Sequence, residues 1–341
     1  MKTYKSTIKN YLPDFMVVLV INLLTNYEEL RVTRYDRKRF KNNYSSAAKK
    51  NRNSIDRLNA NLIFYAHSIE KGLSHDNMRL GFGSSKLISL IKNLDQYELN
   101  GYSKEGKAYQ NALSVIKHYC DIHDSHDYDY QSRNLIPKRY IQLANNADLS
   151  LGGVVNINKK DKLNNSRKPF SEIISKRYSI REFSRESVPI SVLQEAIEIS
   201  MKTPTVCNRQ SMRVRIIKNG TIIQNVLEKQ GGFTGYPAPP VLLVVSTDTK
   251  TFINITERNQ VYVDGGLFSM SLLLSLESLG MAACPLNAMQ TIKNEIKIRK
   301  MINIPQNENI IMYIAVGQMP EKIGVPKSFR YSADDIMTII K

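Results

Sequence analysis

The stretch KRYSIREF, residues 176–183, says most about how this chain of 341 residues folds and what it binds. Within five positions it places two arginines, Arg177 and Arg181, and the hydroxyl of Ser179. Arginine offers a planar fork of donors, and a serine hydroxyl or a backbone N–H occupies the remaining lone pairs of a phosphate. The stretch therefore predicts a phosphate-binding segment. A solvated basic surface is the alternative that these eight residues leave open.

A second polar segment, TPTVCNRQ at residues 203–210, follows later in the chain. It comes directly after residues 190–201, whose apolar positions have the helical period. Its threonines, asparagine and glutamine make it a turn rich in hydrogen-bonding groups. The two segments together predict a bound phosphorylated cofactor.

The composition is that of a globular protein, with 42% hydrophobic and 23% charged residues and enough length for two domains or for one domain with a large extension. The net charge is +17, and residues 1–60 hold thirteen lysines and arginines against five acidic residues. Such a region suits anionic lipid, an acidic polysaccharide or nucleic acid, or it is a solvated basic face. Because no known nucleic-acid module accompanies the charge, we expect no nucleic-acid partner.

The apolar run FMVVLVINLL, residues 15–24, is about half as long as a bilayer-spanning helix. No small-residue cleavage site follows it, so it is not a typical signal peptide. We expect a buried or interfacial helix here, and peripheral membrane contact through residues 1–60 stays open. Three scattered cysteines argue against a disulfide framework and for a reducing, cytoplasmic location: Cys120, Cys207 and Cys284.

Residues 151–168 divide the chain by composition. Leu151, Gly152 and Gly153 break regular structure, and the segment that follows is polar and rich in asparagine. We therefore expect a mainly helical, basic region of unknown function at residues 1–150, a linker at 151–168 and a second domain at 169–341. In the first region, the helical period occurs at residues 58–69, 86–94 and 108–119.

The second domain mixes helical and strand patterns, which predicts an α+β fold. Helices are expected at residues 170–176, 190–201, 265–279 and 293–301, and strands at 214–217, 241–245, 281–284 and 310–316. The helix at 265–279 is apolar nearly all round, so we expect it at the centre of the domain or in a subunit interface.

From about Phe170 to the C-terminus, the chain resembles the nitroreductase family of FMN flavoproteins. Residues 177–183 are similar to the family's Arg-Arg-Ser-x-Arg-x-Phe motif, and residues 203–210 are similar to its Ala-Pro-Ser-x-x-Asn-x-Gln turn. Three further segments match in order: DGG at 264–266, LGMAACP at 279–285 and the basic PKSFR at 326–330.

The resemblance implies a nitroreductase-like fold: a central, mostly antiparallel sheet flanked by helices, with a long buried central helix, in a homodimer. It implies an FMN-dependent oxidoreductase with ping-pong kinetics. NAD(P)H would reduce the flavin, and a small acceptor (a nitro compound, a quinone or a related molecule) would then be reduced. No protein acid or base is needed because the cofactor performs the chemistry, and no histidine occurs after residue 126.

The resemblance also implies the site residues. Around the phosphate of FMN we expect Arg177, Ser179, Lys327 and Arg330, with Tyr178 also among the cofactor contacts. Arg181 is expected at N1 and O2 of the flavin, where it polarises the ring. The flavin of the other subunit would be reached by Pro204, Thr205, Val206 and Asn208. The segment that runs past the ring would be Pro285, Leu286, Asn287 and Ala288, and it would offer backbone N–H groups to N5 and O4.

A second interpretation keeps the fold without the reaction. Nitroreductase-like proteins with an N-terminal helical extension are linked to surface-polysaccharide biosynthesis, so the domain could be a flavin-binding scaffold or a partner-binding protein. The basic N-terminal region would then contact a membrane or an acidic polymer.

Two strings in the first region contain groups capable of binding a metal or each other. His118, His123 and His126 lie among aspartates, but their spacing matches no standard zinc pattern, so no metal is expected. In HSIEKGL, residues 67–73, His67 and Glu70 share a helical face. We expect a hydrogen-bonded pair there, with a glycine ending the helix.

Overall fold

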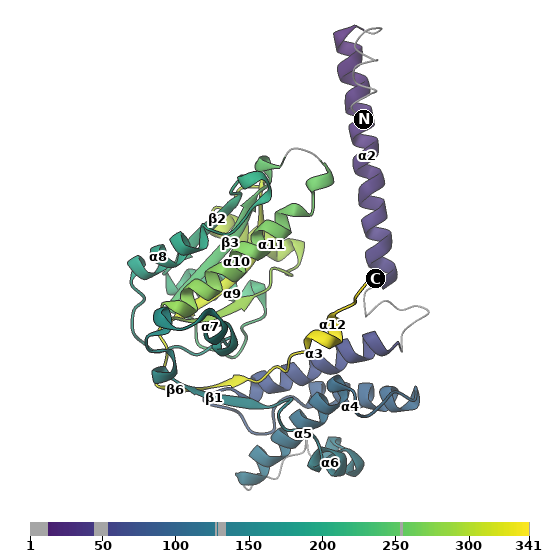
Figure 1. The fold of residues 1–341 in the computed structure, drawn as a ribbon, viewed down its shortest axis with the longest axis vertical. Helices are drawn as coiled ribbons and strands as arrows, with labels where there is room; N and C mark the ends of the chain where they lie inside the picture. Colours follow the sequence, from purple (N-terminus) through teal and green to yellow (C-terminus); the bar gives the residue numbers. More distant parts are fainter. Residues whose placement is uncertain (1–12, 44–53, 127, 129–133, 253–254, 341) are drawn as a thin grey trace.

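A computed structural model describes residues 13–43, 54–126, 128, 134–252 and 255–340. Figure 1 shows two lobes and one long helix that leads away from them. The helical lobe contains α3 (Ile55–Leu73), α4 (Ser84–Leu99), α5 (Lys107–Ser125) and α6 (Lys138–Asn145). The sheet lobe runs from α7 (Phe170–Lys176) to β5 (Glu308–Gly317).

The helical lobe has its own core, as its apolar period predicts. On α3 the buried side chains are Leu58, Leu62, Ala66, Ile69 and Leu73, spaced by three or four residues. They pack against matching positions of α4 and α5 in one apolar cluster. The three helices that the period predicts are present, and each extends beyond the predicted residues at both ends.

The apolar run 15–24 belongs to α2 (Asp14–Asn43). Of the two expectations for it, the buried helix is wrong for most of its side chains, and the interfacial helix stays a prediction. Val17 is buried, but six apolar side chains are exposed: Phe15, Met16, Val18, Leu19, Leu23 and Leu24. The physical reason is visible in Figure 1, where α2 extends away from both lobes. In the described part of the chain, no helix combines the length and apolarity needed to cross a membrane.

The sheet lobe is built on four antiparallel strands in the order β2-β3-β5-β4. They are β2 (Met212–Ile217), β3 (Val241–Asp248), β5 and β4 (Ala282–Leu286). β3 is buried on both faces, and its successive side chains alternate between two apolar clusters. The helices around the sheet are α7, α8 (Ile190–Ser200), α9 (Gly220–Gln230), α10 (Gln260–Ser278) and α11 (Ile292–Met301). The α+β fold expected from the sequence is confirmed.

The long helix α10 begins at Gln260, earlier than the sequence indicates. It lies so close to β5 that a Cβ on Gly265 would come within 2.6 Å of the Ile311 side chain. One face carries buried residues such as Phe268 and Leu272. The opposite face exposes Tyr262, Val263, Leu267 and Met270. The helix is therefore buried on one side only in a single chain.

Residues 151–168, expected to be a linker, contain regular structure. Strand β1 (Val154–Asn158) pairs antiparallel with β6 (Lys322–Pro326) in a second, two-stranded sheet. The difference arises because three of its five residues are β-branched, which suits a strand, although the segment around them is polar. β6 also packs against α3, so the C-terminal segment, including α12 (Ala333–Ile336), returns to the helical lobe.

Candidate cofactor site

The arginine stretch is held along the edge of the four-stranded sheet. The N–H of Ile180 donates to the carbonyl of Ala283 in β4, with an N···O distance of 3.0 Å. Ile180 is fully buried, and Tyr178 packs against the same small apolar cluster between the lobes. Side chains of an extended segment alternate in direction. Arg177 precedes this apolar pair and Arg181 follows it. The side chains of the two arginines therefore point away from the apolar cluster.

Both arginines carry a buried nitrogen without a hydrogen-bond partner. These atoms are Nη1 of Arg177 and Nε of Arg181. Arg181 does donate from Nη1 to the Ser179 carbonyl at 3.2 Å. Burial lowers the pKa of Arg177, Glu277 opposes this shift and Arg330 adds to it. Because a buried N–H without a partner is costly, two such donors on neighbouring arginines make this segment suited to an anionic ligand.

The two arginines share a neighbour in Cys284, a buried free thiol on β4. Burial raises the pKa of this thiol, and three cations act against the shift: Arg181, Lys71 and Arg177. Two of these cations were expected at the site. The third, Lys71, lies on α3 of the helical lobe, so the candidate site lies where the two lobes meet.

Residues 285–288, directly after Cys284, are the last two residues of β4 and the two that follow it. Leu286 packs its side chain in the apolar core, so only its backbone is available to a ligand. Asn287 is exposed, and its Oδ1 accepts from the Met289 N–H at 3.0 Å. The Asn287 carbonyl accepts from Gln230 at 3.0 Å. These bonds hold the segment in one conformation.

The basic tail approaches the cluster through one of its two cations. Arg330 lies near enough to Arg177 to lower its pKa, while its own guanidinium bonds to the carbonyls of Ser328 and Phe329. Lys327 is bound elsewhere: its ammonium donates to the Leu149 carbonyl at 2.9 Å. The structure therefore brings Arg330, and not the Lys327 ammonium, to Arg177.

The turn at residues 203–210 lies at the other end of α10. The Val206 N–H donates to the buried Asp264 at 3.2 Å. Asp264 and Glu277, the neighbour of Arg177, are thirteen residues apart on α10, which is about 20 Å at 1.5 Å per residue. Pro204, Thr205 and Asn208 belong to the same turn. Within one chain, these four predicted contacts are thus separated from the arginine cluster.

Reasoning from sequence missed the contribution of the helical lobe. The hydroxyl of Tyr236 donates to the Lys71 carbonyl at 2.8 Å, and its ring stacks on His75 with 3.9 Å between the centroids. His75 also contacts the Glu182 carboxylate at 3.2 Å. The only sequence signal was the string HSIEKGL, whose His67–Glu70 pair is present at 3.3 Å. α3 ends at Leu73, so Gly72 lies within the helix instead of ending it.

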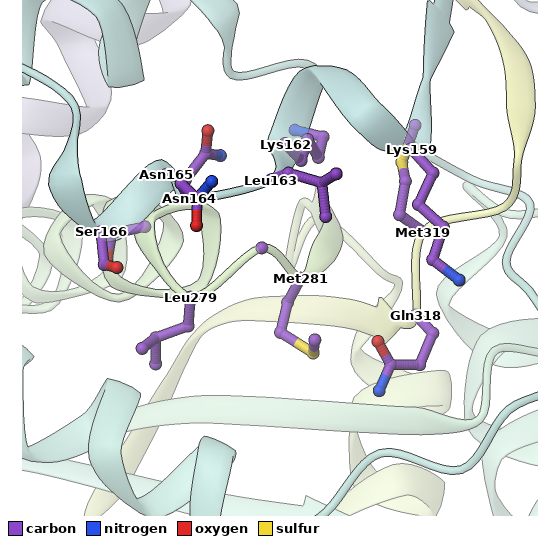
Figure 2. Close-up of a pocket in the computed structure, with 12 residues that line it drawn as sticks. Lys159, Lys162, Leu163, Asn164, Asn165, Ser166, Leu279, Met281, Gln318 and Met319 are labelled. Atoms are coloured by element: carbon purple, nitrogen blue, oxygen red, sulfur yellow. The ribbon is translucent and has the colours of Figure 1, made fainter.

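A cavity of about 370 Å³ lies at the C-terminal end of α10. Figure 2 shows Asn164, Asn165 and Ser166 at one side of it and Lys159, Gln318 and Met319 at the other. None of the residues expected to bind FMN lines it. Lys162 lines the wall and forms a buried ion pair with Glu277 at 2.6 Å. The Lys162 ammonium is thus already paired with a carboxylate, and the cavity is less suited to an anion than the arginine cluster is.

The three histidines at residues 118–126 bind backbone carbonyls one turn earlier on α5 and not one another. Nδ1 of His123 donates to the Tyr119 carbonyl at 2.7 Å, and Nε2 accepts from the Gly81 N–H at 2.9 Å. His118 and His126 each contact a carbonyl of residue i−4. Among the described residues, no group of His, Cys, Asp and Glu side chains has a geometry suited to a metal ion.

Comparison with known proteins adds a family to this geometry. The sequence profile of the Nitroreductase family matches residues 174–233 and 235–318. The matched residues include the arginine stretch, the 203–210 turn and β4, and they end before the basic tail.

Solved structures resemble about half of the chain. A protein from Parabacteroides distasonis, assigned as an NADH dehydrogenase/NAD(P)H nitroreductase, is 22% identical, with a TM-score of 0.44 over 50% of this chain and 96% of that one. A Desulfovibrio desulfuricans protein assigned as a nitroreductase, in complex with FMN, is 18% identical. Its TM-score is 0.44, and the match covers 51% of this chain and 98% of that protein. A nitroreductase-like protein from Streptococcus mutans is 16% identical, with a TM-score of 0.44, and the match covers 50% of this chain and 98% of that protein.

Proposed function

Given that residues 174–318 form a nitroreductase family domain, we propose that this protein is an FMN-dependent oxidoreductase that passes two electrons from NAD(P)H to a small acceptor. The observation that carries the proposal is the pair of buried, unpartnered nitrogens on Arg177 and Arg181. The family match supports a flavin oxidoreductase in general, and the two orphaned donors supply a reason for an anionic cofactor at this place in the chain.

The residues present fit FMN by the chemistry of their donors. The phosphate of FMN carries a charge near −2 and needs cationic donors when it is partly desolvated. Arg177 offers its orphaned Nη1, with Arg330 nearby. Ser179, two residues after Arg177, completes the proposed contacts of this segment. The Tyr178 side chain packs in the apolar cluster, so only its backbone is proposed to contact the cofactor. Lys327 would join them only if its ammonium left the Leu149 carbonyl.

Arg181 has a different role in the proposal. FMN, when bound, supplies the hydride chemistry, and negative charge develops at the N1 and O2 edge of its ring. The Arg181 guanidinium is held by the Ser179 carbonyl and keeps a free Nε donor, so it is placed to stabilise that charge. The backbone of residues 285–288 is proposed to meet the N5 and O4 edge. No side chain of the protein is assigned a proton-transfer step.

A homodimer is part of the proposal, because the residues expected to contact one flavin lie far apart within a single chain. The 203–210 turn and the arginine cluster lie at opposite ends of α10. A second copy could bring its turn to the first copy's site. The apolar face of α10, with Tyr262, Val263, Leu267 and Met270 exposed, offers the surface for such a copy.

The test is spectroscopic. Purified full-length protein should be yellow or take up added FMN, and anaerobic NADH or NADPH should bleach it. Size-exclusion chromatography with light scattering should give the mass of a dimer. Colourless protein that takes up no FMN at micromolar concentration would contradict the proposal.

A specific observation also favours a membrane-associated role, either in addition to turnover or as a flavin-binding scaffold without it. α2 exposes Phe15, Leu19 and Leu23 in its first half, and basic residues follow along the same helix. Exposed apolar side chains next to positive charge suit an anionic membrane, or an acidic polymer by charge alone. Part of the basic region, residues 1–12 and 44–53, lies outside the described residues.

The membrane role is tested by sedimentation with anionic vesicles. Wild-type protein should sediment with them, and less so at high salt. Leu19→Asp with Leu23→Asp should abolish binding, whereas Leu99→Asp, at an exposed apolar residue of α4, should not. Equal binding by all three proteins would remove this role.

A further inference from the structure

The C-terminal half of α3 lies directly against the proposed FMN site. The Tyr236 ring is the link: its hydroxyl donates to the Lys71 carbonyl at 2.8 Å, and the Arg181 guanidinium carbon lies 6.0 Å from its centroid. His75, two residues after the helix, stacks on the same Tyr236 ring with 3.9 Å between the centroids. The Lys71 backbone and the Arg181 guanidinium therefore meet at Tyr236 across the lobe boundary, and the charge of Arg181 acts on the Lys71 ammonium.

A second contact fixes α3 one turn earlier. The Ser328 hydroxyl lies 3.2 Å from Nδ1 of His67, and Ser328 precedes Phe329 and Arg330 in the basic tail. His67 and Lys71 are four residues apart and share one face of α3, about 6 Å along its axis. This face thus meets both the tail and the surroundings of Arg181.

The carboxylates around Lys71 are already bonded to other groups. Glu70 accepts from the Gly153 N–H at 3.1 Å and contacts His67. Glu182 contacts His75 and accepts from the Asp76 N–H at 3.0 Å. Within the described part of the chain, no carboxylate is bonded to Lys71 or Arg181.

Lys71 is thus a half-buried cation beside a second cation. Burial lowers the pKa of Lys71, and the charge of Arg181 lowers it further. Placing two like charges together without a counterion is unfavourable unless a ligand brings negative charge. In the proposed arrangement the phosphate of FMN lies with Arg177 and Arg330, and the negative charge that develops at the N1 and O2 edge balances one of the two cations, so the other is left for a second negative group.

We propose that Lys71 is a specificity-determining residue that binds a negatively charged group of the acceptor, so that the substrates are anionic acceptors. The inference rests on the proposed function, because it places the acceptor at the FMN site. The helical lobe then has a defined role: α3 brings a cation to the edge of the site, next to Arg181 and the Tyr236–His75 stack. The sheet lobe holds the cofactor, and the helical lobe selects what is reduced.

The experiment compares two acceptors of the same shape, 4-nitrobenzoate and the neutral 4-nitrobenzamide, on the FMN-loaded full-length protein. Four proteins are measured: wild type, Lys71→Gln, Lys71→Arg and Lys92→Gln, an exposed lysine of α4 as the matched control. The first readout is the ratio of kcat/KM values for the two acceptors. The second needs no turnover: it is the Kd of benzoate and of benzamide, from the change in visible absorbance of the bound flavin.

Wild-type protein should prefer the anion in both readouts. Lys71→Gln should lower the preference about tenfold, the size expected for loss of one charge-assisted hydrogen bond. Lys71→Arg should retain most of it, and Lys92→Gln all of it.

Two results overturn the inference while leaving the proposed function intact. One is FMN-loaded protein whose benzoate Kd is the same in wild type and Lys71→Gln. The other is a Lys71→Gln protein that loses activity on both acceptors equally and binds FMN more weakly, since Lys71 would then serve the cofactor. Protein that binds no FMN, or is not reduced by NADH or NADPH, contradicts the proposed function and this inference with it.

Discussion

The helical lobe and the candidate cofactor site treat their buried charged and titratable groups differently. In the helical lobe, Glu70 and His123 are each bonded to a backbone N–H, and His123 also to a carbonyl. At the candidate site, Arg177 and Arg181 each keep one buried nitrogen without a partner. A satisfied buried group stabilises the fold, whereas an orphaned donor costs about 1–3 kcal/mol until a ligand accepts from it. The comparison thus separates residues whose buried groups are bonded within the chain from the two residues that we propose bind a ligand.

One buried pair that is bonded within the chain lies close to the arginines with unpartnered nitrogens. Lys162 and Glu277 form a buried ion pair, and Glu277 also acts on the charge of Arg177. If the comparison is correct, replacing a satisfied group should lower stability with or without FMN. Replacing an orphaned donor should change FMN binding and leave the apoprotein nearly as stable as before.

The largest effect is expected at the ion pair. Glu277→Leu leaves the Lys162 ammonium buried without its carboxylate, so the free energy of unfolding should fall by about 3–5 kcal/mol in urea titrations. The double variant Lys162→Met with Glu277→Leu should recover most of this loss, since it removes both charges. A single variant as stable as wild type would show that the pair is not buried as described.

Arg177→Ala should come next. Loss of a charge-assisted contact to the phosphate should raise the Kd of FMN about 100-fold, measured by quenching of flavin fluorescence. The melting temperature of the apoprotein should change little. Lys176→Ala is the matched control, because Lys176 is exposed and bonded to Glu172. Equal FMN affinity in both variants would remove Arg177 from the proposed site.

Arg181→Ala should affect the reaction more than binding. Without a cation at the N1 and O2 edge, the reduction potential of the bound flavin should fall, and its anaerobic reduction by NAD(P)H should slow about tenfold. The Kd of FMN should rise less than in Arg177→Ala. Potential and stopped-flow rate both equal to those of wild type would show that Arg181 does not polarise the ring.

The smallest effect is expected in the helical lobe, as a dependence on pH. Burial holds the pKa of His123 below its ordinary value of 6.5. Above pH 6.5 the His123 ring is neutral in the folded and in the unfolded chain, so its full contribution to stability is present. As the pH falls below 6.5, the unfolded chain takes up a proton that the folded chain does not, so stability declines until the folded pKa is reached.

Urea titrations between pH 8 and pH 5 measure this decline. His123→Gln should flatten it relative to its own value at pH 8. His126→Gln, at an exposed residue of the same helix, should leave the slope as in wild type. A slope that is unchanged in His123→Gln would assign the acid sensitivity to other groups.

Much of the fold could be predicted from local pattern. The helical period placed α3, α4 and α5, and apolar runs between turn residues placed β2, β3, β4 and β5 within a few residues. The stretch RYSIR drew attention for its two arginines and its serine, and the structure added that Tyr178 and Ile180 are packed apart from them. Such patterns are readable because a residue's neighbours at two, three or four positions decide which face it occupies.

Other features had no local signal. The pairing of β1 with β6 joins residues far apart in the chain, and α2 proved exposed although its run 15–24 is apolar. The binding of Lys327 to Leu149 likewise depends on which segment lies opposite. Each of these features depends on a distant segment of the chain, and the hydrophobic pattern of one segment does not say which other segment packs against it.

The amino-acid order alone was therefore sufficient for the kind of domain in the second half, for most of its elements and for the two arginines on which the proposed site rests. Tertiary packing decided which other groups surround them, above all that Tyr236 joins Lys71 of α3 to the surroundings of Arg181. The physical reason is that periodicity and motif spacing act over a few residues, whereas a site at a lobe boundary is set by contacts that form only when distant segments fold together.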